Sequence, residues 1–430
     1  MSFAEQFRDS GPAWLAGARR AAMDHFIATG FPTKKNEDWH FTSPAAIAET
    51  DWLPLRDPSG QVQPDDLAPF LLGLDAPRLV FVNGRYTATL SSLAGLPSRV
   101  RVLDLAGHWN DAAAENWLTK IATPTRDAFT ALNTAFTVDG AIVHVPADTV
   151  VETPIHLLYV TDPEAAKGAT HPRTLIVADR HAVVTVIESY VTLGDARYFT
   201  NAVTEIQVAD GAKVDHYRIE RESDRAYHVG TTEVRQGRDS RYQSFSFATG
   251  GALARVNLYT VLGGEGGETL MHGLYMLDGT QHIDHQTRIE HAAPHCASRE
   301  VYKGIMDDAS HGVFNGKVYV QPEAQKTDGK QTNNNVLLSE TAHADTKPQL
   351  EIFADDVKCT HGATVGRLDE VALFYLRSRG IDLEQARTLL TYAFAADVLE
   401  RIDQPEVRKA LEALTLERFV GGGAELVAAA

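Results

Sequence analysis

The sequence predicts a mainly β protein, a right-handed parallel β-helix (solenoid) flanked by helical units at both ends. Three observations lead to this fold class. From Leu79 onward, short runs alternate apolar or β-branched residues with polar ones. Between residues 173 and 320, short turns recur about every 30 residues with no helical pattern between them. Helical periodicity is confined to the two ends of the chain, and a pair of β-sandwiches is the second choice of fold.

The N-terminal helical unit is predicted to span residues 1–77. Apolar residues recur there at helical spacing, and a glycine and a proline then end the helix. The periodic residues are Trp14, Leu15, Ala18, Ala22 and Phe26, and the stop signals are Gly30 and Pro32. A link rich in proline and aspartate completes this unit.

The β-helix core is predicted to span residues 78–362. Apolar runs at 79–82, 141–145 and 173–177 read as strands, and turns built from Asp, Gly and Ala lie at 178–182, 208–212, 236–239, 263–267 and 307–309. A single coil cannot bury its apolar face alone, so successive coils are expected to stack. Residues 333–335 are three asparagines, which would suit amide stacking between coils but are more common in ordinary loops.

The C-terminal helical unit is predicted to span residues 363–430. Asp369 opens a first helix that ends at Gly380, and Asp382 with Gln385 forms a capping box for the next one. A third helix follows a second capping box around Pro405. The apolar stripe of this unit must cover another surface.

Composition excludes several functions. The 430 residues carry 57 acidic and 40 basic side chains, a formal charge of -17 that repels nucleic acids and anionic membranes. We therefore expect no nucleic-acid and no membrane partner. No secretory signal is visible and no apolar run approaches the roughly 20 residues that span a bilayer, so a cytoplasmic protein is expected. Two cysteines fit a reducing compartment and cannot hold an iron-sulfur cluster alone.

The first candidate site is the pair Cys359 and His361. Residues two apart on a strand project from the same face, so the thiolate and the imidazole could approach one metal ion. Sulfur and imidazole nitrogen suit iron or zinc. From the pattern alone, packing with a satisfied histidine is the more common outcome.

The second candidate lies at His282, Asp284 and His285, followed by His291, His295 and Cys296. Strand alternation separates His282 and Asp284 from His285, so these ligands cannot all converge from one strand. A structural or interface polar cluster is therefore favoured over a metal site.

Enzyme motifs are missing from the sequence. There is no phosphate-binding loop with its lysine, so no ATP site is expected, and there is neither a nucleophile elbow nor a zinc-protease helix. A non-catalytic scaffold is the preferred reading. The alternative is a parallel β-helix carbohydrate-active enzyme, which would need convergent carboxylates or a calcium site and no partner.

The segments 358–370 (KCTHGATVGRLDE) and 373–381 (LFYLRSRGI) closely resemble the C-terminal signature of the SufB/SufD family of iron-sulfur cluster assembly proteins. Weaker matches lie at 30–39 (GFPTKKNEDW), 79–84 (LVFVNG), 131–136 (ALNTAF), 154–155, 171–173 (HPR) and 310–316 (SHGVFNG), so the resemblance covers nearly the whole chain. The segment around Trp39 and the small number of cysteines are similar to the SufD branch rather than to SufB, whose members usually carry more cysteines.

The resemblance implies a scaffold of the SUF system that pairs with SufB while its C-terminal helices dock the SufC ATPase. The position of His361 is implicated in a transient iron-sulfur cluster at the interface with SufB, and Cys359 matches a family position with a less certain role. ATP binding by a SufC pair would then move the docked helices and reshape that interface. The sequence does not decide the cluster type, whether a flavin participates, or whether the isolated chain forms a homodimer.

Overall fold

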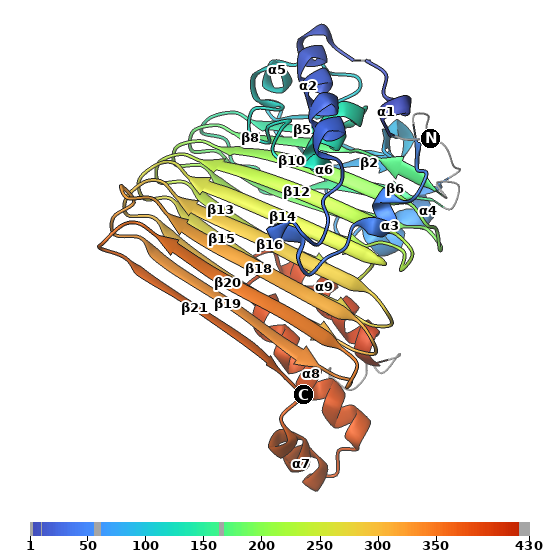
Figure 1. The fold of residues 1–430 in the computed structure, drawn as a ribbon, viewed down its shortest axis with the longest axis vertical. Coiled ribbons are helices and arrows are strands. Elements are labelled where there is room, and N and C mark those ends of the chain that lie inside the picture. Colours follow the sequence, from blue (N-terminus) through green and yellow to red (C-terminus); the bar gives the residue numbers. More distant parts are fainter. Residues whose placement is uncertain (1–2, 10, 56–61, 163–166, 421–430) are drawn as a thin grey trace.

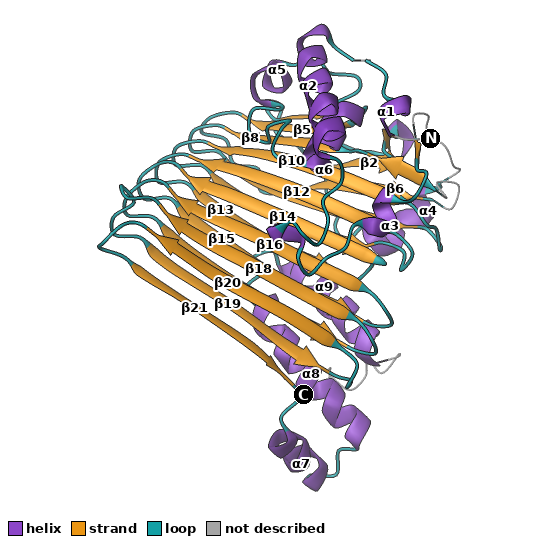
Figure 2. Cartoon of the chain, viewed as in Figure 1, coloured by secondary structure: helices purple, strands orange, loops and turns teal. Residues whose placement is uncertain are grey.

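The computed structural model describes residues 3–9, 11–55, 62–162 and 167–420, which form a parallel β-helix between two groups of helices (Figures 1 and 2). Consecutive strands alternate between two sheets, so each coil contributes one strand to each sheet. This arrangement confirms the predicted mainly β solenoid with helical units at both ends. None of the helices in the described ranges is long and apolar enough to cross a membrane.

The first sheet contains, in spatial order, β20 (His343–Ile352), β18 (His311–Val320), β16 (His282–His291), β14 (Leu253–Leu262), β12 (Tyr227–Gln236), β10 (Phe199–Val208), β8 (Arg173–Ala178), β5 (Gly140–Val145) and β4 (Arg101–Asp104), with β7 (Gly168–Thr170) and β1 (Leu53–Pro54) attached beside β10. The second sheet contains β21 (Lys358–Gly366), β19 (Asp328–Leu337), β17 (Ala297–Met306), β15 (Glu268–Leu277), β13 (Arg241–Ala248), β11 (Lys213–Arg221), β9 (Val183–Thr192), β6 (Ile155–Thr161), β2 (Arg78–Val82) and β3 (Arg85–Tyr86).

Coil length is nearly constant along the solenoid. Register partners in successive coils of the first sheet are separated by 26 residues at Tyr227 and Leu253 and by 32 residues at His311 and His343. Each of the five predicted turns contains a residue with positive φ: His181, Gly211, Asp239, Gly266 and Asp308. A left-handed residue lets the chain reverse within a few residues, and Gly and Asp adopt this conformation at low cost.

The two ends of the solenoid differ. At the N-terminal end the ladder finishes with the short strands β3 and β4, which pair antiparallel to β2 and β5. At the C-terminal end, β20 pairs only with β18 and β21 pairs only with β19. The last coil therefore leaves a row of backbone groups unpaired along each sheet.

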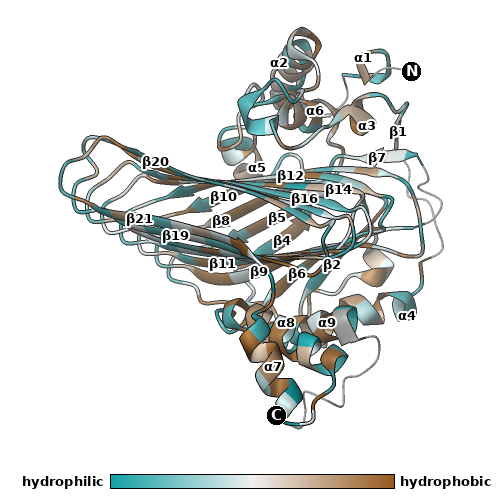
Figure 3. Cartoon of the chain, turned by 60° about the horizontal axis from the view of Figure 1, so that its bottom comes forward, coloured by the Kyte–Doolittle hydropathy of each residue, from teal (hydrophilic) through white to brown (hydrophobic). Residues whose placement is uncertain are grey.

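Apolar side chains from both sheets fill the interior of the coil, and the helices cover the two outer faces (Figure 3). The N-terminal helices α1 (Phe3–Gln6), α2 (Ala13–Thr29) and α3 (Ala45–Ala48) lie over the first sheet, and α4 (Pro64–Leu67) packs beside β2 and β6. The C-terminal helices α8 (Leu383–Leu399) and α9 (Pro405–Val420) pack on the second sheet. Short 3-10 turns lie at Glu37–Trp39, Ala68–Phe70 and Ala88–Leu90.

Two further helices lie inside the range 78–362 that the sequence predicted as β-helix core. These are α5 (Ala112–Trp117) and α6 (Ala128–Phe136). Asp127 begins α6 by accepting hydrogen bonds from the backbone N–H groups of Phe129 and Thr130. Every residue of α6 is buried, because α2 covers it on one side and the first sheet on the other.

Candidate functional site

Cys359 and His361 lie on β21, the outermost strand of the second sheet. Their register partners on β19 are Gly329 and Gln331. Cys359 is half-buried and packs against the apolar cluster that contains Val318, whereas His361 is exposed. Both belong to the interior-facing set of the strand, and His361 is exposed because no further coil covers it.

The thiol of Cys359 is held in its neutral form. Burial raises the pKa of Cys359, and the nearby carboxylate of Asp328 adds to the increase, against the backbone N–H of Gly329. Among the described residues, the groups of three or more potential ligands within reach of one ion lie elsewhere. Cys359 and His361 therefore offer two ligands at most and leave further coordination to another molecule.

A polar column runs from His361 into the solenoid. In register below His361 lie Gln331 and then Glu300, one on each preceding strand of the second sheet. Gln331 donates a hydrogen bond to Glu300 at 2.6 Å. Burial raises the pKa of Glu300 to about 7, so this carboxyl can exist in its neutral form in the interior.

The second candidate cluster divides as strand alternation predicts. His282 and Asp284 lie on the outer side of the first sheet, where both contact the hydroxyl of Thr42, and Asp284 also pairs with Arg255 at 2.7 Å. His285 points into the core, 3.0 Å from the hydroxyl of Ser246, and burial lowers its pKa to about 3. This segment is a set of structural contacts.

The other members of that cluster are also dispersed. The Nε2 atom of His291 lies 2.9 Å from the hydroxyl of Ser298 inside the coil. Cys296 is buried and donates to the carbonyl of Gly264, and burial raises its pKa. His295 is an exposed turn residue with a φ of 60°.

The three asparagines of 333–335 lie on β19 and not in a loop. Asn333 donates to the hydroxyl of Tyr275 at 3.1 Å, and Asn335 donates to the side chain of Asn333 at 2.7 Å. The amides therefore satisfy one another and a core tyrosine near the open end, which differs from the expected stacking between asparagines of successive coils.

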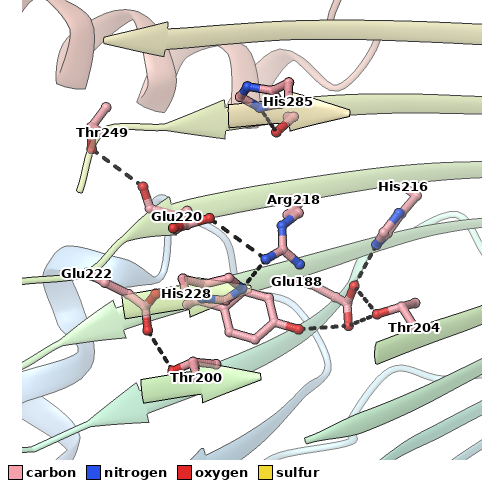
Figure 4. A network of polar contacts seen from close by, with 12 residues as sticks. Glu188, Thr200, Thr204, His216, Arg218, Glu220, Glu222, His228, Thr249 and His285 are labelled. Carbon is pink, nitrogen blue, oxygen red and sulfur yellow. Dashed lines mark hydrogen bonds and ion pairs between the residues drawn. The ribbon is translucent and has the colours of Figure 1, made fainter. Parts of the chain in front are cut away.

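A network of charged side chains lies deeper in the interior (Figure 4). Glu188 accepts hydrogen bonds from Thr174 and Thr204 and pairs with His216 at 2.8 Å. Burial alone would raise the pKa of Glu188, but His216 outweighs it and the pKa is lowered. Glu188 therefore remains charged in the interior.

Glu220 behaves differently in the same network. Burial raises the pKa of Glu220 against the opposing charges of His228 and Arg218, and neither carboxyl oxygen has a hydrogen-bond partner among the described residues. Glu222 pairs with Nδ1 of His228 at 2.6 Å, while Nε2 of His228 contacts Arg218. Since a guanidinium can only donate, Nε2 accepts and Nδ1–H donates to Glu222.

The C-terminal helices have two surroundings. The apolar stripes of α8 and α9 are covered by the second sheet, as the sequence predicted, through contacts that include Val398 and Leu411. Helix α7 (Glu370–Ser378) contains no buried residue, although Val371, Phe374 and Tyr375 lie on it. Figure 3 shows α7 projecting away from the β-helix. This helix presents an uncovered apolar surface.

Sequence reasoning did not bring together His311, His343 and Asp345. They lie on β18 and β20, and their ligand atoms are within 4.8 Å of one another. The separation of one coil between His311 and His343 was the signal that could have found them, because it matches the turn period.

Comparisons with known proteins cover the whole length of the chain. Residues 3–157 match the family model of the SufBD protein N-terminal region, and residues 159–394 match that of the SUF system FeS cluster assembly, SufBD core domain. An iron-sulfur cluster assembly SufBD family protein of Synechocystis sp. is 37% identical over 90% of this chain and 87% of the relative. The iron-sulfur cluster assembly proteins SufD of Escherichia coli and Bacillus subtilis are 34% and 29% identical, over 93% and 97% of this chain and 92% and 96% of their own lengths.

Proposed function

Since this chain belongs to the SufBD family and is SufD-like, we propose that it is a non-catalytic scaffold subunit on which iron-sulfur clusters are built together with SufB and SufC. The observation that carries the proposal is the open last coil, which holds Cys359 and His361 without further ligands from this chain. Free thiols at Cys296 and Cys359 favour a cytoplasmic location. The matched family gives no support to a carbohydrate-active enzyme.

The open end supplies the interface for SufB. Strands β20 and β21 have one unpaired edge each, and the exposed apolar side chains Ile352, Phe353 and Val365 lie in the same coil. Unpaired edges with apolar side chains are a template for strand addition by another chain. A partner strand placed along β21 would bring its own side chains next to His361.

A shared cluster follows from the ligand count. Iron-sulfur clusters are held by four protein ligands, usually thiolates. His361 is exposed and free to turn toward a cluster, while the half-buried, neutral thiol of Cys359 must first lose a proton. We therefore assign His361 the main role and Cys359 a secondary one, with SufB supplying the remaining ligands. The cluster is the product being assembled and not a resident cofactor.

Helix α7 supplies the docking surface for the SufC ATPase. Phe374 is 74% exposed, and a phenylalanine buries about 150–250 Å² when fully covered, so a partner could remove about 150 Å² from water at this residue. At about 25 cal/mol per Å², that burial is worth up to about 4 kcal/mol. A few such residues are enough for a specific interface.

Movement of the docked helices can reach the open end through the second sheet. Lys303 on β17 donates to the carbonyl of Phe394 at 2.9 Å and pairs with Asp397 at 2.8 Å, both on α8. The same strand carries Glu300, which lies in register below Gln331 and His361. ATP-driven displacement of α7 and α8 would therefore act on the strand beneath His361.

The test is co-purification of the tagged chain under anaerobic conditions, with partner identification and iron and sulfide analysis. Wild type should recover an ABC-type ATPase and a cysteine-richer paralogue with bound cluster. His361→Ala should keep both partners and lose most of the cluster, whereas His108→Ala, at an exposed histidine in the N-terminal half, should keep it.

The docking surface is tested separately with the purified ATPase. Phe374→Ala should weaken its binding by at least about 30-fold, the effect of a typical interface hot spot. Ile27→Ala, which truncates an equally exposed apolar residue on α2, should have no effect. A lone, iron-free wild-type chain would refute the scaffold, normal cluster content in His361→Ala would remove His361 from the site, and unchanged binding by Phe374→Ala would remove α7 from the interface.

A further inference from the structure

A column of three histidines crosses the outer side of the first sheet near its open end. His282, His311 and His343 occupy the same register on β16, β18 and β20. The rings of His282 and His311 are 4.6 Å apart, and those of His311 and His343 are 4.9 Å apart. Asp345 follows His343 by two residues and therefore points to the same side.

We propose that His311, His343 and Asp345 bind one divalent first-row transition metal ion. The Nε2 atoms of His311 and His343 lie 2.8 Å and 3.4 Å from Oδ2 of Asp345. With metal-ligand distances of about 2.1 Å, neighbouring ligands are separated by about 3.0 Å in octahedral and about 3.4 Å in tetrahedral coordination. The three ligand atoms already have nearly this spacing before any ion binds.

The ligand set also leaves room for chemistry. Two histidines with one carboxylate and open positions form the usual ferrous iron site, and the same set accepts zinc or cobalt. The side chain of His343 is 65% exposed, so it can rotate to shorten its distance to the other two ligands. No strand covers the outer edge of β20 among the described residues, so water or a further ligand can reach the ion.

His282 is excluded as a fourth ligand. Oγ1 of Thr42 lies 2.5 Å from the carboxylate of Asp284 and 2.8 Å from Nε2 of His282. The hydroxyl has one hydrogen, which it donates to Asp284, so it accepts from Nε2–H of His282. His282 therefore packs its ring against His311 and fixes the inner side of the site.

The second cluster with comparable spacing does not meet the same criteria. Glu220, Glu222 and His228 lie within 4.8 Å of one another but are fully buried. Both nitrogens of His228 are occupied, one by Glu222 and the other by Arg218. An ion there would have to displace a buried guanidinium, whereas the site on β18 and β20 needs no displacement of a cation.

The experiment uses the metal-free, full-length chain without partners. It is titrated anaerobically with Co²⁺, whose visible absorption reports coordination, and with Fe²⁺ and Zn²⁺ by calorimetry. Wild type should bind one equivalent saturably. His343→Ala and Asp345→Asn should weaken binding by at least about tenfold, since even second-shell changes at metal sites have that effect.

The controls separate this site from other histidines and from the proposed function. His108 pairs with Asp104 at 3.3 Å at another exposed position that lacks a third ligand, so His108→Ala should bind Co²⁺ as wild type does. His361→Ala should also bind normally, because the inference does not depend on the shared cluster. Equal thermal stability of His343→Ala and wild type shows that the fold is intact. The proposal is overturned if wild type has no saturable site, or if His343→Ala and Asp345→Asn bind like wild type.

Discussion

The buried ion pair between Arg173 and Glu205 should contribute several kcal/mol to stability. Arg173 on β8 donates from Nε and Nη2 to one oxygen of Glu205 on β10 at 3.0 Å and 2.7 Å, and the two side chains are 1% and 0% exposed. Glu205 also accepts three backbone N–H groups, from Thr119, Ile121 and Ala122, at 2.8–3.0 Å. The pair thus fastens the segment before α6 to the first sheet.

Substitution of Arg173 by methionine keeps most of the side-chain volume and removes the charge. It also removes the donors to Asn133 and Thr134 of α6, at 3.0 Å and 2.9 Å. Breaking one partner of a buried pair costs about 3–5 kcal/mol, because the other charge remains buried. With an unfolding entropy of about 2.1 cal/mol/K per residue, this corresponds to a decrease of about 3–6 °C in Tm if the chain unfolds as one unit.

Two assays measure the effect. Differential scanning fluorimetry gives Tm, and amide hydrogen exchange followed by mass spectrometry reports local opening, since solenoids can unfold in segments. Peptides from 119–136 should exchange more than about 100-fold faster in Arg173→Met. Arg225→Met is the matched control, because Arg225 forms an exposed pair with Asp195 that is worth less than about 1 kcal/mol.

A double variant sharpens the test. Arg173→Met combined with Glu205→Leu should be no more stable than Arg173→Met alone, because leucine leaves the three backbone N–H groups unsatisfied. A Tm for Arg173→Met within 1 °C of wild type, together with unchanged exchange in 119–136, would refute the reasoning.

Three further predictions concern the interior and the N-terminal segment. Acidification from pH 7 to pH 5 should lower Tm, because burial lowers the pKa of His156, His171 and His285 to about 4, about 3 and about 3. The unfolded chain then binds protons below its pKa of about 6.5 that the native interior excludes, so stability falls with pH; a constant Tm over this range would contradict it. Glu220→Gln should cost less than about 1 kcal/mol, since its pKa is raised, whereas Glu188→Gln should cost about 2–4 kcal/mol because a charged hydrogen-bond acceptor is lost. Equal urea midpoints for these two variants would disprove that difference. Trp39→Ala should accelerate trypsin cleavage at Lys34 and Lys35, because Trp39 stacks on Phe129 and lies 3.9 Å beneath the guanidinium of Arg255, and unchanged digestion would show that these contacts do not fix the segment.

The sequence was sufficient for features that depend on local periodicity. Turn residues such as Gly211 and Asp239 mark the coils because the backbone needs a positive φ there. The stripe on α8 was visible because only one side of that helix is buried. Cys359 and His361 could be placed on one face of a strand from their spacing alone.

Features that depend on long-range contacts were not predictable in the same way. Helix α6 gave no amphipathic signal, because all of its sides are buried. Arg173 and Glu205 are 32 residues apart, and their backbone partners come from a third segment. His311 and His343 meet only because coil lengths place them in register, which requires each turn length to be known.

The unequal ends of the solenoid limit how this chain can polymerise. Parallel coils could in principle add without limit, and a molecule with two open ends would grow into a filament. Here the short antiparallel strands β3 and β4 terminate one end, so among the described strands only β20 and β21 offer long free edges at an end of the stack. Pairing at that end, with a like or an unlike chain, consumes the free edges of both molecules, and association stops at two.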